Sequence, residues 1–203
     1  MIKGSLSKLI FFGISCLALS ACLPGSAPET HEVSAFSGKT VCRIAVLPFL
    51  NESREKDAGD LMYRVFLNEL TAAGISEVVS EGDVRQFMTL FRQMPQEIHA
   101  TSTPLMAQMA EQLGADAIVR GRIVQYGTES VGQDARIPFV ALQVEMVSVM
   151  DGARLFSTFH RRSGNDYRKA LHFGLVRTKT GLFVRVASEV IDDWRSKGEF
   201  SCP

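Results

Sequence analysis

The sequence has no excess of positive or of negative charge. Lys and Arg number 22 and Asp and Glu number 22, so the formal net charge is +0. Nucleic-acid binding driven by counterion release depends on a basic surplus, and the sequence does not supply one. A long hydrophobic run is also missing, because the longest is about 13 residues and a membrane-spanning helix needs ~20. The short apolar run near the N-terminus is therefore not interpreted as a transmembrane anchor.

Motifs of the common catalytic sites are absent as well. The sequence has no HExxH, no Walker-type phosphate loop, no GxGxxG and, in the chain after residue 21, no GxSxG. The loop at 127–132 has glycines but no helix is expected after it, which argues against a phosphate cradle. No metal-binding spacing joins the four histidines, His31, His99, His160 and His172. The acidic clusters are most simply solvated loops or helix faces: Glu52, Glu55 and Asp57, and Asp192 with Asp193. We therefore expect no catalytic residue, no metal and no cofactor.

Only four cysteines are present, and one of them marks the N-terminal segment. Lysines precede an apolar stretch over 9–19, and small residues follow it, which is the order of a secretory signal. The motif Leu-Ser-Ala-Cys at 19–22 resembles a bacterial lipoprotein signal. The resemblance implies that residues 1–21 are removed and that Cys22 carries diacylglycerol and further fatty-acyl chains such as palmitate. It also implies the periplasmic face of the outer membrane, because Leu23 and not Asp follows the modified cysteine.

Removal of the signal leaves 182 residues (203 minus 21), which fits one domain and a tether. Residues 22–40 are rich in Pro, Gly, Ser and Thr and predict a flexible tether, and residues 41–203 predict a single α/β domain in the periplasm. In an oxidising compartment, Cys42 and Cys202 are expected to pair. That bridge would close a loop of about 160 residues and contribute up to roughly 5 kcal/mol. The alternative is two free thiols that lie too far apart to meet.

The spacing of apolar residues predicts the elements of the domain. Strands are expected at 42–50, 75–79, 116–126, 137–150 and 153–161, with a polar loop over 127–136 and a two-residue turn at Asp151-Gly152. Helices are expected at 58–73, 83–93, 103–113 and 175–195. The expected fold class is α/β, with a mixed β-sheet that ends in a C-terminal antiparallel meander and is covered by about four helices.

Three segments, taken in order, resemble one superfamily: Ile44–Ser53, Ala110–Ile123 and Ser148–Ser157. The superfamily contains the N-terminal domain of TolB, the curli secretion lipoprotein CsgG, the penicillin-binding-protein activator LpoB and the Pel polysaccharide lipoprotein PelC. The resemblance covers about residues 41–194 and implies a TolB N-terminal-domain-like fold. The propeller of TolB is absent, the tether is shorter than that of LpoB, and PelC is nearest in size and layout.

The resemblance implies a non-catalytic outer-membrane lipoprotein, an accessory or assembly component of an envelope export or biogenesis system. Such a protein would contact the membrane through its lipid, would have envelope proteins as partners, and would form a ring of identical subunits, as PelC and CsgG do. The alternative is a monomeric periplasmic regulator of a cell-wall synthase or a Tol-like complex, as LpoB is. An enzyme acting on envelope glycan is a third hypothesis, and it predicts a cleft with convergent titratable groups.

Several residues allow two interpretations each. Arg161 and Arg162 are interpreted either as the solvated end of a strand, which we favour, or as a contact site for lipid headgroups or an anionic glycan. Trp194 is a core residue, which we favour, or an anchor for a membrane or a partner. Four methionines are interpreted either as residues that fill the core, which we favour, or as part of an adaptable binding surface. They are Met88, Met94, Met106 and Met109. The segment 166–194 is not assigned a function.

Overall fold

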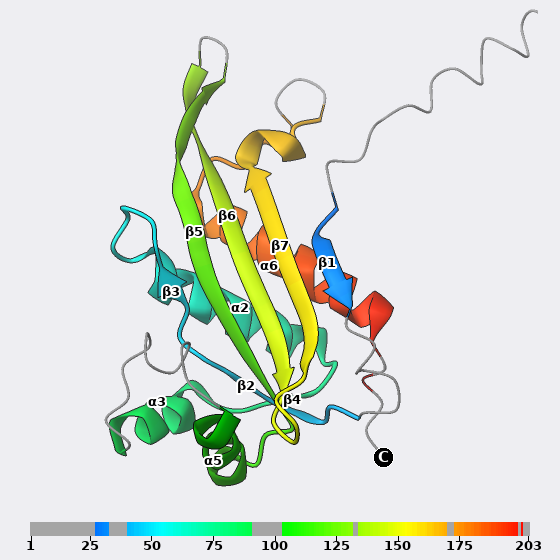
Figure 1. Ribbon diagram of the computed structural model, residues 1–203. Helices are drawn as coiled ribbons and strands as arrows, with labels where there is room; N and C mark the ends of the chain where they lie inside the picture. The colour runs from blue at the N-terminus through cyan, green and yellow to red at the C-terminus, as the bar shows by residue number, and fades with distance from the viewer. Residues whose placement is uncertain are drawn as a thin grey trace, which may run out of the picture.

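A seven-stranded mixed sheet organises the domain (Figure 1). The computed structural model describes residues 27–32, 40–90, 103–131, 134–169, 173–198 and 200. The strands are β1 (Glu29–Glu32), β2 (Arg43–Val46), β3 (Leu50–Asn51), β4 (Glu77–Val78), β5 (Ala117–Val131), β6 (Asp134–Ser148) and β7 (Arg154–Ser163). The helices are α2 (Ala58–Ala73), α3 (Glu81–Leu90), α5 (Thr103–Leu113), the 3-10 helix η3 (Gly164–Tyr167) and α6 (Lys179–Lys197).

The strand order is β1-β7-β6-β5-β2-β4, and β3 pairs with β5 beyond the end of β2. β2 is parallel to β4 and β5, whereas β5, β6, β7 and β1 pair antiparallel in that order. The expected mixed sheet with a C-terminal antiparallel meander and four α-helices is therefore confirmed. Among the described residues, no helix has both the length and the apolar character that crossing a membrane requires.

β2 is buried on both of its faces, as its continuous apolar run predicts. Residues 44–47 are at most 1% exposed. Ile44 and Val46 belong to the larger core under α2 and α6, while Ala45 and Leu47 belong to the smaller core under α3 and α5. The carboxylate of Asp116 accepts hydrogen bonds from the backbone N–H groups of residues 42 and 43, both at 2.9 Å. This contact fixes the start of β2 beside the start of β5.

The helices cover the two faces of the sheet unequally (Figure 1). α2 and α6 lie across one face, and α3 and α5 cover only the lower part of the other face. α2 begins and ends where the sequence predicts, and its last turn is closed by Gly74 at φ 62°. α3 begins at Glu81, where Ser80 accepts a hydrogen bond from the backbone N–H of Asp83 at 3.2 Å. In the upper part of the sheet, one face consequently has no helix of the described residues over it.

Trp194 is a core residue, as favoured from the sequence, and it joins three elements. Its indole is fully buried, stacks on Phe156 of β7 at 5.6 Å and meets Phe66 of α2 edge-on at 5.9 Å. The indole N–H donates a hydrogen bond of 2.7 Å to the hydroxyl of Thr158. That hydroxyl is also 2.7 Å from the hydroxyl of Thr30 in β1. One chain of hydrogen bonds thus connects α6, β7 and β1.

β1 is a strand that the sequence did not predict. It lies inside the stretch 22–40 that was expected to be a tether, and it pairs antiparallel with β7 from Glu29 opposite Phe159 to Glu32 opposite Phe156. Its four residues are mostly exposed and polar, so no apolar alternation indicated a strand. Pairing with the free edge of β7 supplies the stability that the local sequence lacks.

The prediction of a polar loop over 127–136 is wrong. β5 continues to Val131 and β6 begins at Asp134, so these residues form the end of a long hairpin. The two arms stabilise each other by pairing, and the ring of Phe139 lies against Gly127, where a Cβ would come to 3.0 Å from it. Polar residues are tolerated on both faces because this end of the hairpin extends beyond the helices (Figure 1).

Several element boundaries also differ from expectation. The strand expected at 42–50 is β2 followed by the short β3, the strand expected at 75–79 is limited to Glu77–Val78, and the helix expected from residue 83 begins at Glu81. The turn between β6 and β7 is a hairpin turn as predicted, but it has five residues, 149–153, in place of two. Gly152 takes φ 68° there, and its N–H donates to the carbonyl of Ser148 at 3.0 Å. α6 begins at Lys179 and not at residue 175, because the side chain of Thr178 accepts a hydrogen bond from the N–H of Gly181 and caps the helix there.

Replacement of Thr158 by valine tests the hydrogen-bond chain at Trp194. Valine keeps the shape of the side chain but leaves the buried indole N–H without an acceptor, which costs about 1–3 kcal/mol of the free energy of unfolding. Thr30→Val is the matched control, because it leaves the bond between Thr158 and Trp194 intact, and we expect a loss below about 1 kcal/mol. Urea unfolding followed by tryptophan fluorescence measures both losses, and equal losses would contradict the assignment.

Candidate functional site

A charged cluster lies between β7 and α6. Glu189 of α6 accepts hydrogen bonds at one carboxylate oxygen from the Nε of Arg162, at 2.8 Å, and pairs there with the Nε2 of His160, at 2.6 Å. His160 is 2% exposed and Arg162 is 7% exposed. The guanidinium of Arg162 also lies 5.7 Å from the ring centre of Tyr167 in η3. The cluster therefore connects the helix, the last strand and η3 beneath the surface.

The pKa values of this cluster follow from its burial and its charges. Burial acts to raise the pKa of the Glu189 carboxyl, but the hydrogen bonds with His160 and Arg162 outweigh it, so this pKa lies below its ordinary value of 4.5. Burial, together with the nearby Glu189, raises the pKa of the Tyr167 hydroxyl. Glu189 is thus an anion held between two cationic or donor groups, an arrangement that stabilises the junction of β7 and α6.

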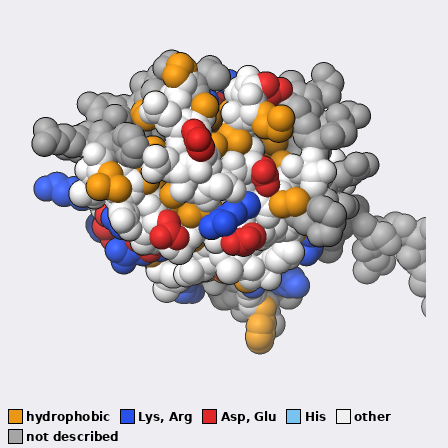
Figure 2. Space-filling view, turned by 90° about the horizontal axis from the view of Figure 1, so that it is seen from below, with side chains coloured by type: hydrophobic (Ala, Val, Ile, Leu, Met, Phe, Trp, Pro, Cys, Tyr) orange, Lys and Arg blue, Asp and Glu red, His pale blue; other side chains and the backbone are white. Residues whose placement is uncertain are grey.

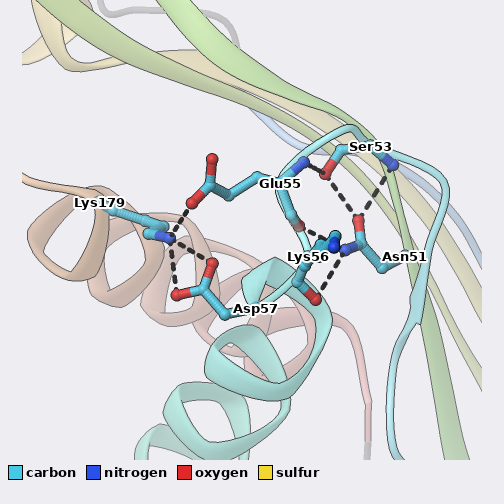
Figure 3. Close-up of polar contacts among 6 residues, drawn as sticks. All are labelled: Asn51, Ser53, Glu55, Lys56, Asp57 and Lys179. Atoms are coloured by element: carbon cyan, nitrogen blue, oxygen red, sulfur yellow. Dashed lines mark hydrogen bonds and ion pairs between the residues drawn. The ribbon is translucent and has the colours of Figure 1, made fainter.

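A second polar cluster joins the start of α6 to the loop 51–57 (Figure 3). The ammonium of Lys179 is 2.7 Å and 2.9 Å from the carboxylate oxygens of Asp57 and 3.1 Å from that of Glu55. It also lies 5.5 Å from the ring centre of Tyr126 on β5. The hydrogen bond from Lys179 lowers the pKa of the Asp57 carboxyl. A lysine at the first residue of a helix is unfavourable for the helix dipole, and the two carboxylates offset that effect.

The loop 51–57 is ordered by its own side chains (Figure 3). Asn51 accepts hydrogen bonds from the backbone N–H and the hydroxyl of Ser53, at 3.0 Å and 2.6 Å. Its amide donates to the carbonyl oxygen of Glu55 at 2.6 Å. Beside this loop is a hollow of about 360 Å³ that is lined by Glu52, Ser53, Arg54, Val124, Gln125 and Tyr126. The hollow is open and its lining is mostly polar.

The face of the sheet that has no helix above it carries paired charges. Arg120 of β5 donates two hydrogen bonds to Glu145 of β6, at 3.0 Å and 2.8 Å, and Arg154 of β7 lies 3.3 Å from the same carboxylate. Phe159 of β7 is 42% exposed on this face, and Val124 is the extra residue of a bulge in β5. The single carboxylate of Glu145 is therefore shared by two arginines, which connect β5, β6 and β7 across this face.

The structure places the residues that the sequence singled out as follows. Cys22, Cys202, Met94, His99 and His172 lie outside the described residues, so the lipid at Cys22 and the Cys42–Cys202 disulfide stay predictions. Met106 and Met109 are buried, as expected of core filling. Asp192 is exposed and pairs with Arg195, as expected of a solvated helix face, whereas Asp193 pairs with Lys197 and is only 17% exposed. His31 lies on β1, opposite Ser157.

The sequence analysis did not predict which side chains pair with each other in the cluster around Glu189 or in the cluster around Lys179. Arg162 was expected to be a solvated strand end, which is wrong, because it is buried on Glu189. Residues 156, 158, 160 and 162 of β7 alternate inward, so the period of the strand could have placed His160 and Arg162 in the interior. No pattern in the sequence indicated the contacts of Glu189 and Lys179, because the residues that they pair with lie on other elements. Arg161 remains exposed, as the period requires.

Glu189→Gln tests the buried cluster through its pH dependence. Because the folded pKa is below 4.5, the charged carboxylate stabilises the fold above that pH and loses its contribution as the pH falls through the folded pKa. We expect a loss of about 2 kcal/mol at neutral pH, narrowing toward zero in acid. Asp192→Asn on the same helix is the control and should change the free energy of unfolding by less than about 0.5 kcal/mol. If the difference in the free energy of unfolding between the wild-type and Glu189→Gln proteins does not become smaller below pH 4.5, the charge effect is refuted.

No protein-family model matches the chain, and no curated protein matches it in sequence. Solved structures do match in fold. The lipoprotein GNA1162 from Neisseria meningitidis aligns with a TM-score of 0.55 and 22% identity, over 76% of this chain and 99% of its own. A PelC dodecamer from Paraburkholderia phytofirmans aligns with a TM-score of 0.50 and 20% identity, over 80% of this chain and 97% of its own.

The C-terminal domain of LpoB from Salmonella enterica aligns more weakly, with a TM-score of 0.47 and 16% identity, over 63% of this chain and 87% of its own. That likeness is too remote to bear on function. The likeness to GNA1162 and PelC extends over more than three quarters of this chain. This chain therefore has the fold of the lipoprotein GNA1162 and of PelC, and a PelC-like fold is what the sequence resemblance predicted.

Proposed function

We propose that this chain is a lipoprotein that works by contact at the periplasmic face of the outer membrane, as an accessory or assembly component of an envelope export or biogenesis system. The observation that carries the proposal is a domain with the fold of the lipoprotein GNA1162 and of PelC, preceded by a lipoprotein-type signal that ends at Cys22. Either feature alone is common, whereas their combination points to one kind of protein.

The use of the polar side chains supports contact over catalysis. The side chains of the buried cluster, His160, Arg162 and Glu189, pair with one another and connect two elements. Lys179 is occupied by two carboxylates. Within the described ranges, no group of three or more His, Cys, Asp or Glu side chains is placed to hold a metal ion. We therefore propose no enzymatic activity for this chain.

Tethering is the proposed mechanism. A domain attached to a bilayer meets other membrane-bound proteins at a high effective concentration, even when each contact is weak. A single acyl chain anchors only marginally, so the two or three chains that Cys22 is proposed to carry are what make the attachment durable.

The proposed assembly is a ring of identical subunits. It is supported by PelC, a chain with the same fold that forms a dodecamer. A ring of this kind uses one surface of each subunit against a different surface of the next. The competing proposal is a monomeric regulator of a cell-wall synthase or a Tol-like complex, and the mass in solution separates the two.

Cys22→Ser in the full chain tests the anchor. The wild-type protein should sediment with the envelope. The Cys22→Ser protein should not, because it lacks the sulfur that carries the lipid. Fractionation of cells measures the distribution, and mass spectrometry of the wild-type protein should find an acylated Cys22 at the N-terminus. Cys16→Ala is the control, because Cys16 lies in the segment 1–21 that is predicted to be removed, and its loss should leave sedimentation with the envelope unchanged. Equal sedimentation of the wild-type and Cys22→Ser proteins would refute the proposal.

Analytical ultracentrifugation of the detergent-extracted, acylated protein tests the ring. We expect a species of many subunits that persists on dilution. A monomer in detergent, and again after reconstitution into vesicles, would overturn the ring and favour the monomeric regulator.

A further inference from the structure

β1 determines from which end of the domain the N-terminal chain arrives. It runs antiparallel to β7, with Glu29 opposite Phe159, and β7 ends at Ser163 beside η3 (Figure 1). The chain therefore enters β1 from the η3 end of the sheet. Six residues separate Cys22 from Glu29, and the seven steps between their Cα atoms span at most about 25 Å when fully extended. The five residues of β7 from Phe159 to Ser163 rise by only about 14 Å over four steps, so Cys22 can reach the η3 end.

The two ends of the domain differ in charge although the whole chain is neutral. In the segment 161–177, Arg162 is buried on Glu189 and Arg161 pairs with Glu129, which leaves three basic side chains and one acidic side chain among the described residues: Arg168, Lys169 and Arg177, against Asp166. At the opposite end, α3, α5 and the turn 149–153 include four acidic side chains and one basic side chain: Glu81, Asp83, Glu111 and Asp151, against Arg85. The end that faces the N-terminal chain is thus the basic one.

The basic end, which we define as residues 161–169 and 173–177, also presents an aromatic ring. Phe173 is 76% exposed. The backbone N–H of Lys169 donates a hydrogen bond of 2.6 Å to the carbonyl of Phe173, so the two residues lie together at the surface. The N–H of Val176 donates to the carbonyl of Gly164 at 3.0 Å and closes the segment at its base. In the part of the chain that the structure describes, neither Lys169 nor Arg177 has an ion-pair partner.

We infer that the basic end is a second membrane contact, at which Lys169 and Arg177 bind anionic phospholipid headgroups and Phe173 enters the interface. The inference rests on the proposed anchor at Cys22, which brings this end to the bilayer. Basic side chains beside an anionic surface attract it within a Debye length, and aromatic rings favour the interface between headgroups and acyl chains. The lipid and the basic end together would fix the orientation of the domain as well as its location.

The opposite end has a different surface. Seen from below, it shows hydrophobic, acidic and basic side chains interspersed over α3, α5 and the β6–β7 turn (Figure 2). Its most exposed apolar residue is Met150, at 91%. Its acidic balance would repel an anionic bilayer, so this end is directed away from the membrane and toward partners.

Vesicle binding by the unacylated protein tests the inference. The mature chain, residues 22–203, is prepared with Cys22→Ser, so that any binding comes from the surface of the domain. We expect it to sediment with phosphatidylglycerol vesicles at low salt, to be released at high salt and not to bind phosphatidylcholine vesicles. Because each basic residue near an anionic surface contributes about fivefold to partitioning, Lys169→Gln with Arg177→Gln should lower binding by about 30-fold.

Matched variants keep the result interpretable. Arg64→Gln with Arg195→Gln makes the same change in net charge at exposed positions on α2 and α6 and should leave binding within about twofold. Phe173→Ser should lower binding about tenfold, while Met150→Ser should not. Thermal unfolding checks that all variants fold. Equal losses in the two charge pairs, or no binding of the parent protein to phosphatidylglycerol vesicles, would overturn the inference. Neither outcome would alter the result of cell fractionation, which tests the lipid at Cys22 separately.

Discussion

The hydroxyl of Thr158 is the contact on which the arrangement of the domain depends. It accepts the buried indole N–H of Trp194 from α6 and meets Thr30 from β1, so one side chain connects a helix, a central strand and an edge strand. An indole donor without an acceptor in a dry core is costly, which restricts α6 to one position along β7. Once α6 is positioned, Trp194 also orients α2 through Phe66.

The two charged clusters act on the same helix at its middle and at its start. Glu189 holds the middle of α6 to β7, and Lys179 holds its first residue to the loop before α2. α6 is therefore attached at three levels, while the opposite face of the sheet is covered only in its lower part. Rigid attachment on one face and an open face on the other suit the contact function that we propose for this domain.

The sequence was most informative where a single segment contains its own signals. β2 and α2 were predicted closely because a continuous apolar run and a three-to-four stripe with a terminal Gly74 are local patterns. β1 could not be predicted, because its partner β7 is far away in the sequence and its own residues are polar. The far end of the β5–β6 hairpin was taken for a loop for a related reason: its arms are stabilised by each other and by no core. The interior placement of His160 could have been read from the strand period, but its partner Glu189 could not.

The pairing of β1 with β7 also imposes an order on folding. Thr30 and Thr158 are 128 residues apart, so β1 has no strand to join until β7 has formed. Contacts between residues so far apart in the sequence form late, because a long loop must close before they are made. β1 has only four residues and lies at the edge of the sheet, so we expect it to be the last strand to join and the first to separate.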